Sequence, residues 1–457
     1  MCSGTKIVKN SMALEIRDPI HGFIHRSTCE QKIIDTRLFQ RLRGIKQLAL
    51  ASLVYPGALH TRFEHCVGAM HIAGRVANKL DLSKELQILR LSALLHDIGH
   101  GPFSHVSEDV LEHLSGKNKI HEQLTAKIIS THKDLNGPLS GCDREEIVGL
   151  LEGKRGDSIL RSILSGPLDV DKQDYLLRDS YFCGVKYGVY DLDRLLETLD
   201  ILPDKGDRLL AIKNDGIQAL EQFVIARYHM TGQVYRHRIR LVTDSMITRA
   251  ITLGIEQDRI DWLRRLFTYE NSEEFLANYL SWDDGRLIRE ILDDRTPQGY
   301  AKSIFDRLLR RQLFKEIFKI RLRDLDPLAR QALLEADKSR ALQLATEIER
   351  AVADSNKGMD EHFVIARIVT QKSAAQTEGS ILVVRSDGSD PVEFRQESVL
   401  FASIDSAIQE QYLAIYCPVE WNDDADKRTK TEQYAKELRP LINDLLRARA
   451  GLFSSNV

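Results

Sequence analysis

The feature that most constrains this chain is a polar cluster at the end of an otherwise apolar helical stretch. Residues 84–97 are apolar almost all round, which indicates a helix that is buried on every side. The stretch ends in His96-Asp97 and continues as HDIGHGPFSH (96–105), which places four histidine or aspartate side chains among ten residues. Because an unpaired buried carboxylate costs free energy, the fold must supply these groups with partners.

A divalent cation would be one such partner, since imidazole nitrogen and carboxylate oxygen both bind these ions. His65 and Asp171 are the natural further ligands, because each lies on its own predicted helix near a turn. The alternative for His96-Asp97 alone is a hydrogen-bonded helix C-cap. Further polar side chains follow at short intervals and favour the metal interpretation: His100, His105, His121 and Glu122.

The segment DVDKQDYLLRD (169–179) is a second concentration of charge. Asp171, Tyr175 and Asp179 stand at i, i+4 and i+8, which places them on one face of a helix. Such a face could hold a metal through Asp171 and anionic substrate oxygens through Lys172 and Tyr175. A solvated, salt-bridged helix is the alternative, and the segment in isolation favours it.

Helical periodicity dominates the first 350 residues, for example over 64–80, where apolar residues recur at i, i+3 and i+4. Residues 208–215 read as a small hairpin with its turn at Asn214-Asp215-Gly216, and Ser104 as the cap of a helix over 105–114. Later segments resemble strands and a closing helix: 364–369, 381–385, 391–394, 411–417 and 424–449. The sequence therefore predicts a mainly α fold with a small C-terminal α+β appendage.

Composition excludes several classes of protein. The net charge of −3 excludes a wholesale polyanion binder, although a local basic patch remains open. The six cysteines form no C-x-x-C pair, so neither a disulfide framework nor a cysteine-rich zinc module is expected. No signal peptide or membrane span is recognisable, so we expect a cytoplasmic protein without a membrane partner.

The order His65, His96-Asp97, Asp171 resembles the H…HD…D pattern of the HD metal-dependent phosphohydrolases, and flanking segments resemble their deoxynucleoside-triphosphate triphosphohydrolase branch. The resemblance covers about residues 15–330 and rests on these segments: 16–24, 41–68, 94–105, 169–195 and 227–237. It implies an HD-domain helical core at 1–255. A helical extension and oligomer interface would follow at 256–355, and a small α+β region at 356–457.

The resemblance also implies the chemistry. One divalent metal ion (Mg, Mn, Fe, Co, Ni or Zn) would be held by His65, His96, Asp97 and Asp171. Water would attack the α-phosphorus of a deoxynucleoside triphosphate, which releases deoxynucleoside and intact triphosphate. The implied catalytic residues are His100, His105, His121 and Glu122. Among them, His105 would protonate the leaving 5′-oxygen.

Substrate contacts follow from the same resemblance. Four residues would bind the triphosphate: Arg62, Lys172, Tyr175 and Arg227. Gln47 and Asp179 would hydrogen-bond the 3′-hydroxyl, while Leu48 and Tyr235 would pack against the deoxyribose and exclude a 2′-hydroxyl. Gln173 and Thr231 depart from the family pattern, so base preference and allosteric control are the least transferable features.

Other interpretations remain open. The stretch 307–323 predicts a basic amphipathic helix, which would serve as a solvated helix, an interface, a nucleotide regulatory site or a weak nucleic-acid patch. The expected partners are deoxynucleoside triphosphates, as substrates and as allosteric activators, and further copies of the chain in a homodimer or homotetramer. The competing functions are another HD phosphohydrolase activity (phosphodiesterase, guanosine-tetraphosphate hydrolase or nuclease) and a nucleic-acid-binding regulatory protein with a vestigial site.

Overall fold

The computed structural model describes residues 15–204, 206–356, 359–369, 379–401 and 411–450. The chain is mainly helical, as predicted, and its contacts divide it into two units. The first unit comprises Met1–Arg240, Asp261–Glu290 and Ala374–Ser406; the second comprises Leu241–Ile260, Ile291–Ser373 and Ala407–Val457. This division does not follow the three consecutive stretches expected from the sequence, because each unit combines segments that are distant in the chain.

The first unit is built mostly from short helices. Its helices are α1 (Thr28–Ile34), α2 (Arg37–Gln40), α3 (Arg62–Lys79), α4 (Leu86–Leu95), α5 (His105–Ser115), α6 (Ile120–Thr131), α7 (Arg144–Leu151), α8 (Ser158–Ser165), α9 (Val170–Cys183), α10 (Leu192–Glu197), α11 (Ile217–Met230), α13 (Asp261–Phe267), α14 (Glu273–Tyr279), α15 (Asp284–Leu292, which reaches the boundary of the unit) and α20 (Phe394–Glu397). Its strands are β1 (Glu15–Asp18), β2 (Gly22–His25), β3 (Leu199–Asp204), β4 (Asp207–Lys213), β7 (Leu382–Val384) and β8 (Val392–Glu393).

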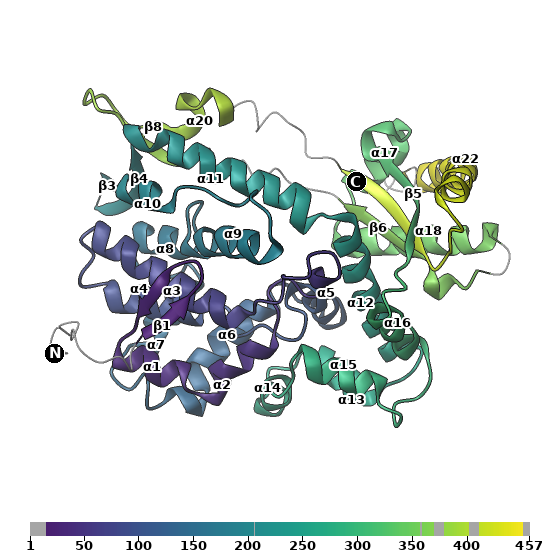
Figure 1. Cartoon of the computed structure of the whole chain (residues 1–457), viewed down its shortest axis with the longest axis horizontal. Helices are drawn as coiled ribbons and strands as arrows, with labels where there is room; N and C mark the ends of the chain where they lie inside the picture. Colours follow the sequence, from purple (N-terminus) through teal and green to yellow (C-terminus); the bar gives the residue numbers. More distant parts are fainter. Residues whose placement is uncertain (1–14, 205, 357–358, 370–378, 402–410, 451–457) are drawn as a thin grey trace. The chain divides into compact units, whose positions relative to one another are not determined.

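Helix α3 lies at the centre of this unit and packs against α4 and α9 (Figure 1). Small buried residues such as Ala69, Ala73 and Ala77 recur on α3 at the spacing of one helical face. They join the apolar side of α4, where Leu89 and Ala93 are buried in the same core cluster. Close packing of these helices brings their polar ends together, and this arrangement positions the site.

A four-stranded sheet in the order β3-β4-β7-β8 completes the first unit. The hairpin predicted at 208–215 exists, but its strands are β3 and β4, which pair from Leu199↔Ile212 to Asp204↔Asp207. The predicted turn at Asn214–Gly216 instead forms a short 3₁₀ turn that leads into α11. Strand β7 adds to β4 in parallel, so the predicted strands at 381–385 and 391–394 belong to this unit and not to the C-terminal appendage.

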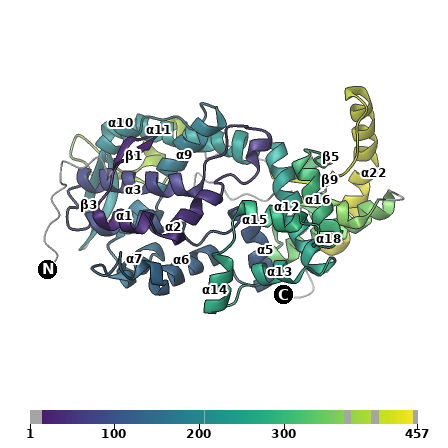
Figure 2. The same ribbon diagram turned by 60° about the horizontal axis from the view of Figure 1, so that its bottom comes forward.

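The second unit combines helices with a three-stranded sheet. Its helices are α12 (Arg238–Glu256, which begins at the boundary), α16 (Tyr300–Leu309), α17 (Pro327–Leu334), α18 (Lys338–Ser355) and α22 (Asp424–Ala450), and its strands are β5 (Lys315–Arg321), β6 (Ile365–Val369) and β9 (Tyr412–Cys417). Strand β9 lies between β5 and β6. Helices α18 and α22 pack beside the strands, as Figure 2 shows for β5, β9 and the two helices. The apolar faces of both helices form one core cluster with the sheet.

The basic helix predicted at 307–323 is wrong. Helix α16 ends at Leu309, and residues 315–321 form β5. The pairing of β5 with β9 shifts register between Glu316 and Phe318, so two consecutive residues, Ile317 and Phe318, are both buried. This bulge hides the alternation that marks a strand and produces a spacing that resembles a helix.

Helix α11 does not end cleanly but passes into a π-helical turn at Thr231–Tyr235, in which the Arg236 N–H donates to the carbonyl of Thr231 at 3.0 Å. Within the described residues, no helix combines the length and apolar character needed to cross a membrane.

Candidate metal centre and active site

Three helices of the first unit contribute the residues expected to hold a metal. His65 lies in the first turn of α3, whose start is stabilised by the Glu64 carboxylate, which accepts from the Thr61 N–H at 2.9 Å. His96 is the C-cap of α4, and Asp97 follows it. Asp171 lies in the first turn of α9, where the Asp169 side chain caps the helix by accepting from the Lys172 N–H.

The structure brings these four side chains together. Nε2 of His65 lies 2.9 Å from Oδ1 of Asp171 and 3.7 Å from Oδ2 of Asp97. Nε2 of His96 lies 3.4 Å from Oδ1 of Asp97 and 3.7 Å from Oδ1 of Asp171. His65 and Asp97 are buried, while Asp171 is partly exposed. Ligand atoms from three separate helix ends therefore converge on one point.

The other ring nitrogens of both histidines are already occupied. Nδ1 of His65 lies 2.8 Å from Oδ2 of Asp174, and Nδ1 of His96 donates to the carbonyl of Ala93 at 2.8 Å. These contacts fix each ring so that Nε2 faces the centre with its lone pair. Both Nε2 atoms are buried and make no hydrogen bond to any residue that the structure describes, although Asp171 is close to His65. Two bare imidazole nitrogens beside two carboxylates fit a divalent cation.

Asp174 is the most heavily coordinated carboxylate near this centre. Besides His65, it accepts from Nε and Nη2 of Arg178 at 2.7 and 2.9 Å and contacts Nε2 of His21 at 2.7 Å. Burial opposes its charge, but Arg178, His21 and His65 together outweigh burial and hold the pKa of Asp174 well below its usual range. A Cβ at Gly68 would lie 1.9 Å from the Asp174 carboxylate, so glycine is required for this approach.

Charges at the centre depend strongly on one another. Burial would lower the pKa of His65, but Asp171 and Asp174 outweigh it and raise that pKa to about 10. Burial would raise the pKa of Asp97, but Arg62, His96 and His100 together outweigh it and hold that pKa well below its usual range. The carboxylates of this site therefore favour protonated imidazoles. A divalent cation can replace those protons, because it supplies the same positive charge to the carboxylates.

A second cluster of histidines adjoins the first. His100 stacks on His121 with ring centroids 4.3 Å apart and meets His105 edge-on at 4.6 Å. Nδ1 of both His105 and His121 contacts the Glu108 carboxylate, for His105 at 3.1 Å. Burial opposes ionisation of Glu108, but the two histidines outweigh it and lower its pKa. His105 is 68% exposed, whereas His100 is buried, and burial holds the pKa of His100 well below its usual range.

Sequence reasoning included Glu122 among the catalytic residues and did not single out Glu108. Glu122 is exposed and pairs with Lys119 at 2.8 Å, and no contact with the histidine cluster is among its described interactions. Glu108 stands three residues after His105 on the same helix, and this spacing was the signal available in the sequence. Asp174 could have been found in the sequence by the same signal, since it follows Asp171 by three residues.

The residues expected to bind the sugar also meet. The Tyr235 hydroxyl donates to Oδ2 of Asp179 at 2.8 Å, and Nε2 of His60 contacts Oδ1 at 2.7 Å. Leu48 is buried in the core cluster against which Tyr175 and Tyr235 pack. The Gln47 N–H donates to the carbonyl of His60 at 3.1 Å, and the buried Gln47 Oε1 has no hydrogen-bond donor within the described part of the chain. His60, which was not assigned a role, therefore supports both predicted hydroxyl contacts.

Cations expected to bind triphosphate lie close by but already have partners. Arg62 is buried, contacts Asp97 and donates from Nε to the Ser104 hydroxyl at 2.8 Å. Lys172 contacts Asp169 and donates to the carbonyl of Gly166 at 3.0 Å. Burial raises the pKa of Tyr175, and the charge of nearby Arg227 opposes that shift.

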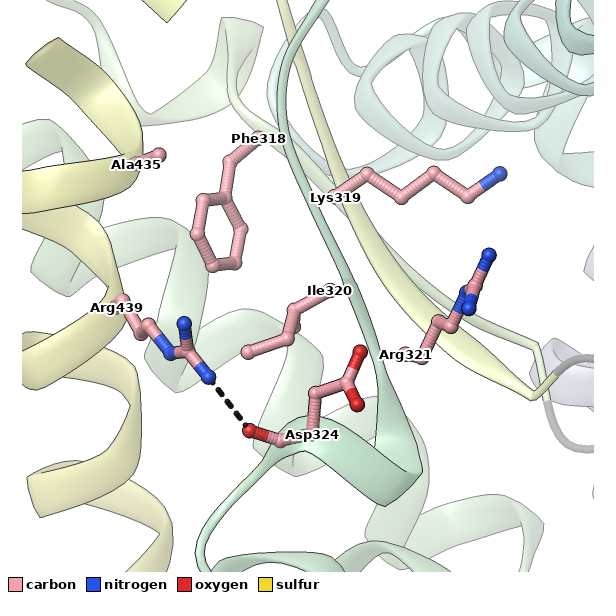
Figure 3. A pocket seen from close by; sticks show the side chains of 7 residues that line it. All are labelled: Phe318, Lys319, Ile320, Arg321, Asp324, Ala435 and Arg439. Atoms are coloured by element: carbon pink, nitrogen blue, oxygen red, sulfur yellow. Dashed lines mark hydrogen bonds between the residues drawn. The ribbon is translucent and has the colours of Figure 1, made fainter. Parts of the chain in front are cut away.

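The residues mispredicted as a basic helix line a cavity of about 570 Å³ in the second unit (Figure 3). Phe318 and Ile320 point from β5 toward α22, while Lys319 and Arg321 lie on the other side of the strand. Arg439 of α22 donates to the carbonyl of Asp324 at 2.9 Å. This place is therefore formed by a strand and a helix of the second unit, and not by one basic helix.

Family models match both regions of the chain. An HD domain matches residues 62–179, which contain all four predicted metal ligands and the second histidine cluster. An HD associated region matches residues 190–434, which is more than half of the chain.

Individual relatives extend this result. An uncharacterised protein of Methanocaldococcus jannaschii is 37% identical over 329 residues, which are 72% of this chain but only 65% of that protein. A deoxynucleoside triphosphate triphosphohydrolase SAMHD1 homologue of Dictyostelium discoideum is 28% identical and matches 94% of this chain and 80% of its own length.

A solved structure of another phosphohydrolase is also similar to this chain. A Bacteroides thetaiotaomicron phosphohydrolase has a TM-score of 0.70 and 26% identity, with 89% of this chain and 99% of that chain covered. The chain therefore belongs to the HD superfamily of metal-dependent phosphohydrolases, and within it resembles the deoxynucleoside-triphosphate triphosphohydrolase branch.

Proposed function

We propose that this protein hydrolyses deoxynucleoside triphosphates to deoxynucleosides and inorganic triphosphate. One observation carries the proposal: helix α9 carries both Asp171 of the His₂Asp₂ centre and Asp179, whose carboxylate contacts His60 and accepts from the Tyr235 hydroxyl. The similarity to a triphosphohydrolase homologue over 94% of the chain supports the same substrate class.

His65, His96, Asp97 and Asp171 would hold the divalent ion. When bound, such an ion acts as a Lewis acid toward phosphoryl oxygen and lowers the pKa of water. Water then attacks the α-phosphorus, the bond from phosphorus to the 5′-oxygen breaks, and the 5′-oxygen takes up a proton.

His105 is the proposed proton donor to that 5′-oxygen. Its exposure lets it exchange protons with solvent, and Glu108 holds its Nδ1, so Nε2 is the nitrogen that faces outward. His121 shares Glu108, and His100 stacks on His121, so both residues would fix the orientation of this pair.

The remaining predicted residues bind the substrate. Arg227 and Tyr175 would contact the triphosphate, and Arg62 and Lys172 would join them by leaving Asp97 and Asp169. Asp179 and Gln47 would accept from the 3′-hydroxyl, while Leu48 and Tyr235 would leave no space for a 2′-hydroxyl.

We also propose that the active form is a homodimer or homotetramer, as in the family that the sequence resembles. Light scattering at micromolar concentration would show the assembly. Activity that rises when a second deoxynucleotide is added would support nucleotide activation. A monomer that is fully active on each deoxynucleotide alone would contradict both parts.

The central experiment incubates the purified protein with Mg, Mn or Co and each of the eight common nucleoside triphosphates, and separates the products by chromatography. We expect inorganic tripolyphosphate and deoxynucleoside from the deoxy substrates and little turnover of the ribonucleotides. Equal rates on ATP and dATP would refute the sugar assignment. Turnover of phosphodiesters or guanosine tetraphosphate alone would favour another HD phosphohydrolase activity.

A further inference from the structure

The turn that leads into α5 has a backbone conformation that side chains rarely adopt. Phe103 and Ser104 have φ values of +60° and +56°, and neither is glycine. Ser104 was expected to cap α5 with its side chain, but it makes no such hydrogen bond. Its hydroxyl instead donates to the carbonyl of Lys46 at 2.9 Å. Conformations of this kind persist only where the surroundings hold them, and His105 follows this turn directly.

Asp284, the first residue of α15, holds this turn. Its Oδ1 accepts from the Phe103 N–H at 2.7 Å, and its Oδ2 accepts from the Lys46 N–H at 3.0 Å. The side chain is only 4% exposed, so no solvent competes for these bonds. One buried carboxylate therefore joins the turn before His105 to the loop that carries Gln47 and Leu48.

Neighbouring contacts leave the turn little freedom. Nη2 of Arg41 donates to the carbonyls of Ile98 and His100 at 2.9 and 2.8 Å. A Cβ at Gly101 would lie 2.4 Å from the Tyr279 hydroxyl, so α14 closes directly over the turn. Asp284 supplies the acceptor at the strained residue itself.

We propose that Asp284 is a positioning residue that aims His105 at the leaving 5′-oxygen. The inference rests on the proposed function. Asp284 lies outside the matched HD domain and inside the HD-associated region, so this region completes the active site by holding its proton donor in place. The carboxylate acts through the backbone of Phe103 and does not contact the substrate.

The test uses Asp284→Asn, which keeps the side-chain volume but removes the charge and leaves one acceptor oxygen for two N–H donors. The bonds to the Phe103 and Lys46 N–H groups therefore cannot both persist. The matched control is Asp283→Asn, because Asp283 accepts from the Arg286 N–H at 2.7 Å and caps the same helix. Both proteins are assayed with a deoxynucleoside triphosphate and with bis(4-nitrophenyl) phosphate. The second substrate releases a nitrophenolate, which leaves without a proton.

We expect Asp284→Asn to lower kcat on the deoxynucleoside triphosphate by about tenfold or more, with KM and metal content close to those of the wild type. Turnover of the nitrophenyl ester should stay within about twofold, because it needs no acid. Asp283→Asn should leave both rates near those of the wild type. Combined with His105→Ala, the Asp284 substitution should add no further loss.

Equal losses on both substrates, or full additivity with His105→Ala, would overturn the inference. If Asp284→Asn does not fold, Asp284→Ser provides the second variant, because its single, shorter hydroxyl cannot accept from both N–H groups; it should show the same selective loss. If the wild type cleaves no deoxynucleotide, the proposed function fails. The positioning role is then read from the His105 imidazole signal in NMR spectra: a shift in Asp284→Asn supports it, and an unchanged signal overturns it.

Discussion

Two clusters of histidines and carboxylates lie side by side in the first unit, and they differ in what their Nδ1 atoms contact. In the centre formed by His65, His96, Asp97 and Asp171, each imidazole Nδ1 contacts an outer acceptor and each Nε2 faces inward. In the cluster formed by His100, His105, His121 and Glu108, two Nδ1 atoms share one carboxylate. Histidine and carboxylate side chains thus suit metal binding in the first cluster and proton transfer in the second.

Exposure separates one histidine of the first cluster from one histidine of the second. His65 is fully buried, whereas His105 is 68% exposed, although Nε2 of His100 lies only 3.3 Å from Oδ1 of Asp97. A metal ligand benefits from burial because water cannot compete for it, while a proton donor needs solvent to recover its proton. The ligand atoms of each cluster lie close enough together to hold a cation, so experiments must show which cluster binds the metal.

The largest effect is expected for Asp97→Ala and Asp171→Ala. Each removes a carboxylate of the buried centre, so bound metal and turnover should be lost together. Metal analysis of the purified variants, alongside the assay, checks this. Glu122→Ala is the control, since its side chain is exposed and pairs only with Lys119 among its described contacts. Unchanged metal content in both aspartate variants would place the ion in the other cluster.

The second effect concerns His105→Ala. Turnover should fall by about 10²–10⁴-fold, the usual contribution of a positioned acid or base, while metal content stays unchanged. Loss of metal in this variant would show that the exposed cluster is itself a ligand set. A near-normal rate would transfer the acid role to His121, which shares Glu108.

The third effect sharpens the role of the outer acceptors. Asp174→Asn should weaken metal binding by roughly 10–100-fold without abolishing it, because His65 remains but its Nδ1 loses a charged partner. Titration of the apo protein with Mn or Co measures this affinity. Wild-type affinity in the variant would show that the orientation of His65 does not depend on Asp174.

The smallest effect is expected in the second unit, at a buried ion pair unrelated to catalysis. Glu349 of α18 contacts Arg249 and accepts from the Ala366 N–H at 2.9 Å. Burial raises the pKa of Glu349 above its ordinary value of 4.5, with Arg249 opposing the shift. Glu349 therefore makes its full contribution to the free energy of unfolding below about pH 4.5. That contribution is lost as the pH rises through the raised pKa of Glu349.

Glu349→Gln cannot ionise, so its unfolding free energy relative to the wild type should rise over that same pH window. Turnover and metal content should not change. Denaturant unfolding at several pH values measures the difference. A relative stability that falls as pH rises would contradict the sign.

Local signals in the sequence predicted most helices, because periodic apolar residues specify a buried face, as on α3 and α4. They also singled out His65, His96, Asp97 and Asp171, since each stands near the end of its helix. Contacts between distant segments left no local trace: nothing near Asp284 indicates Phe103, and nothing near Leu382 indicates its pairing with Ala211. The bulge at Glu316–Phe318 misled prediction for a related reason, since a register shift exists only with a partner strand.

The contact between Tyr235 and Asp179 depends on the number of residues in the π-helical turn at Thr231–Tyr235. Consecutive residues of an α-helix stand about 100° apart, so removing one residue from this turn would shift Tyr235 about 100° around the helix axis. Tyr235 would then point away from Asp179, even though every side chain of the pocket was kept. A one-codon deletion at exposed Gly232 could thus redirect substrate choice more sharply than many substitutions, and insertions or deletions at this turn offer a direct route for the pocket to diverge.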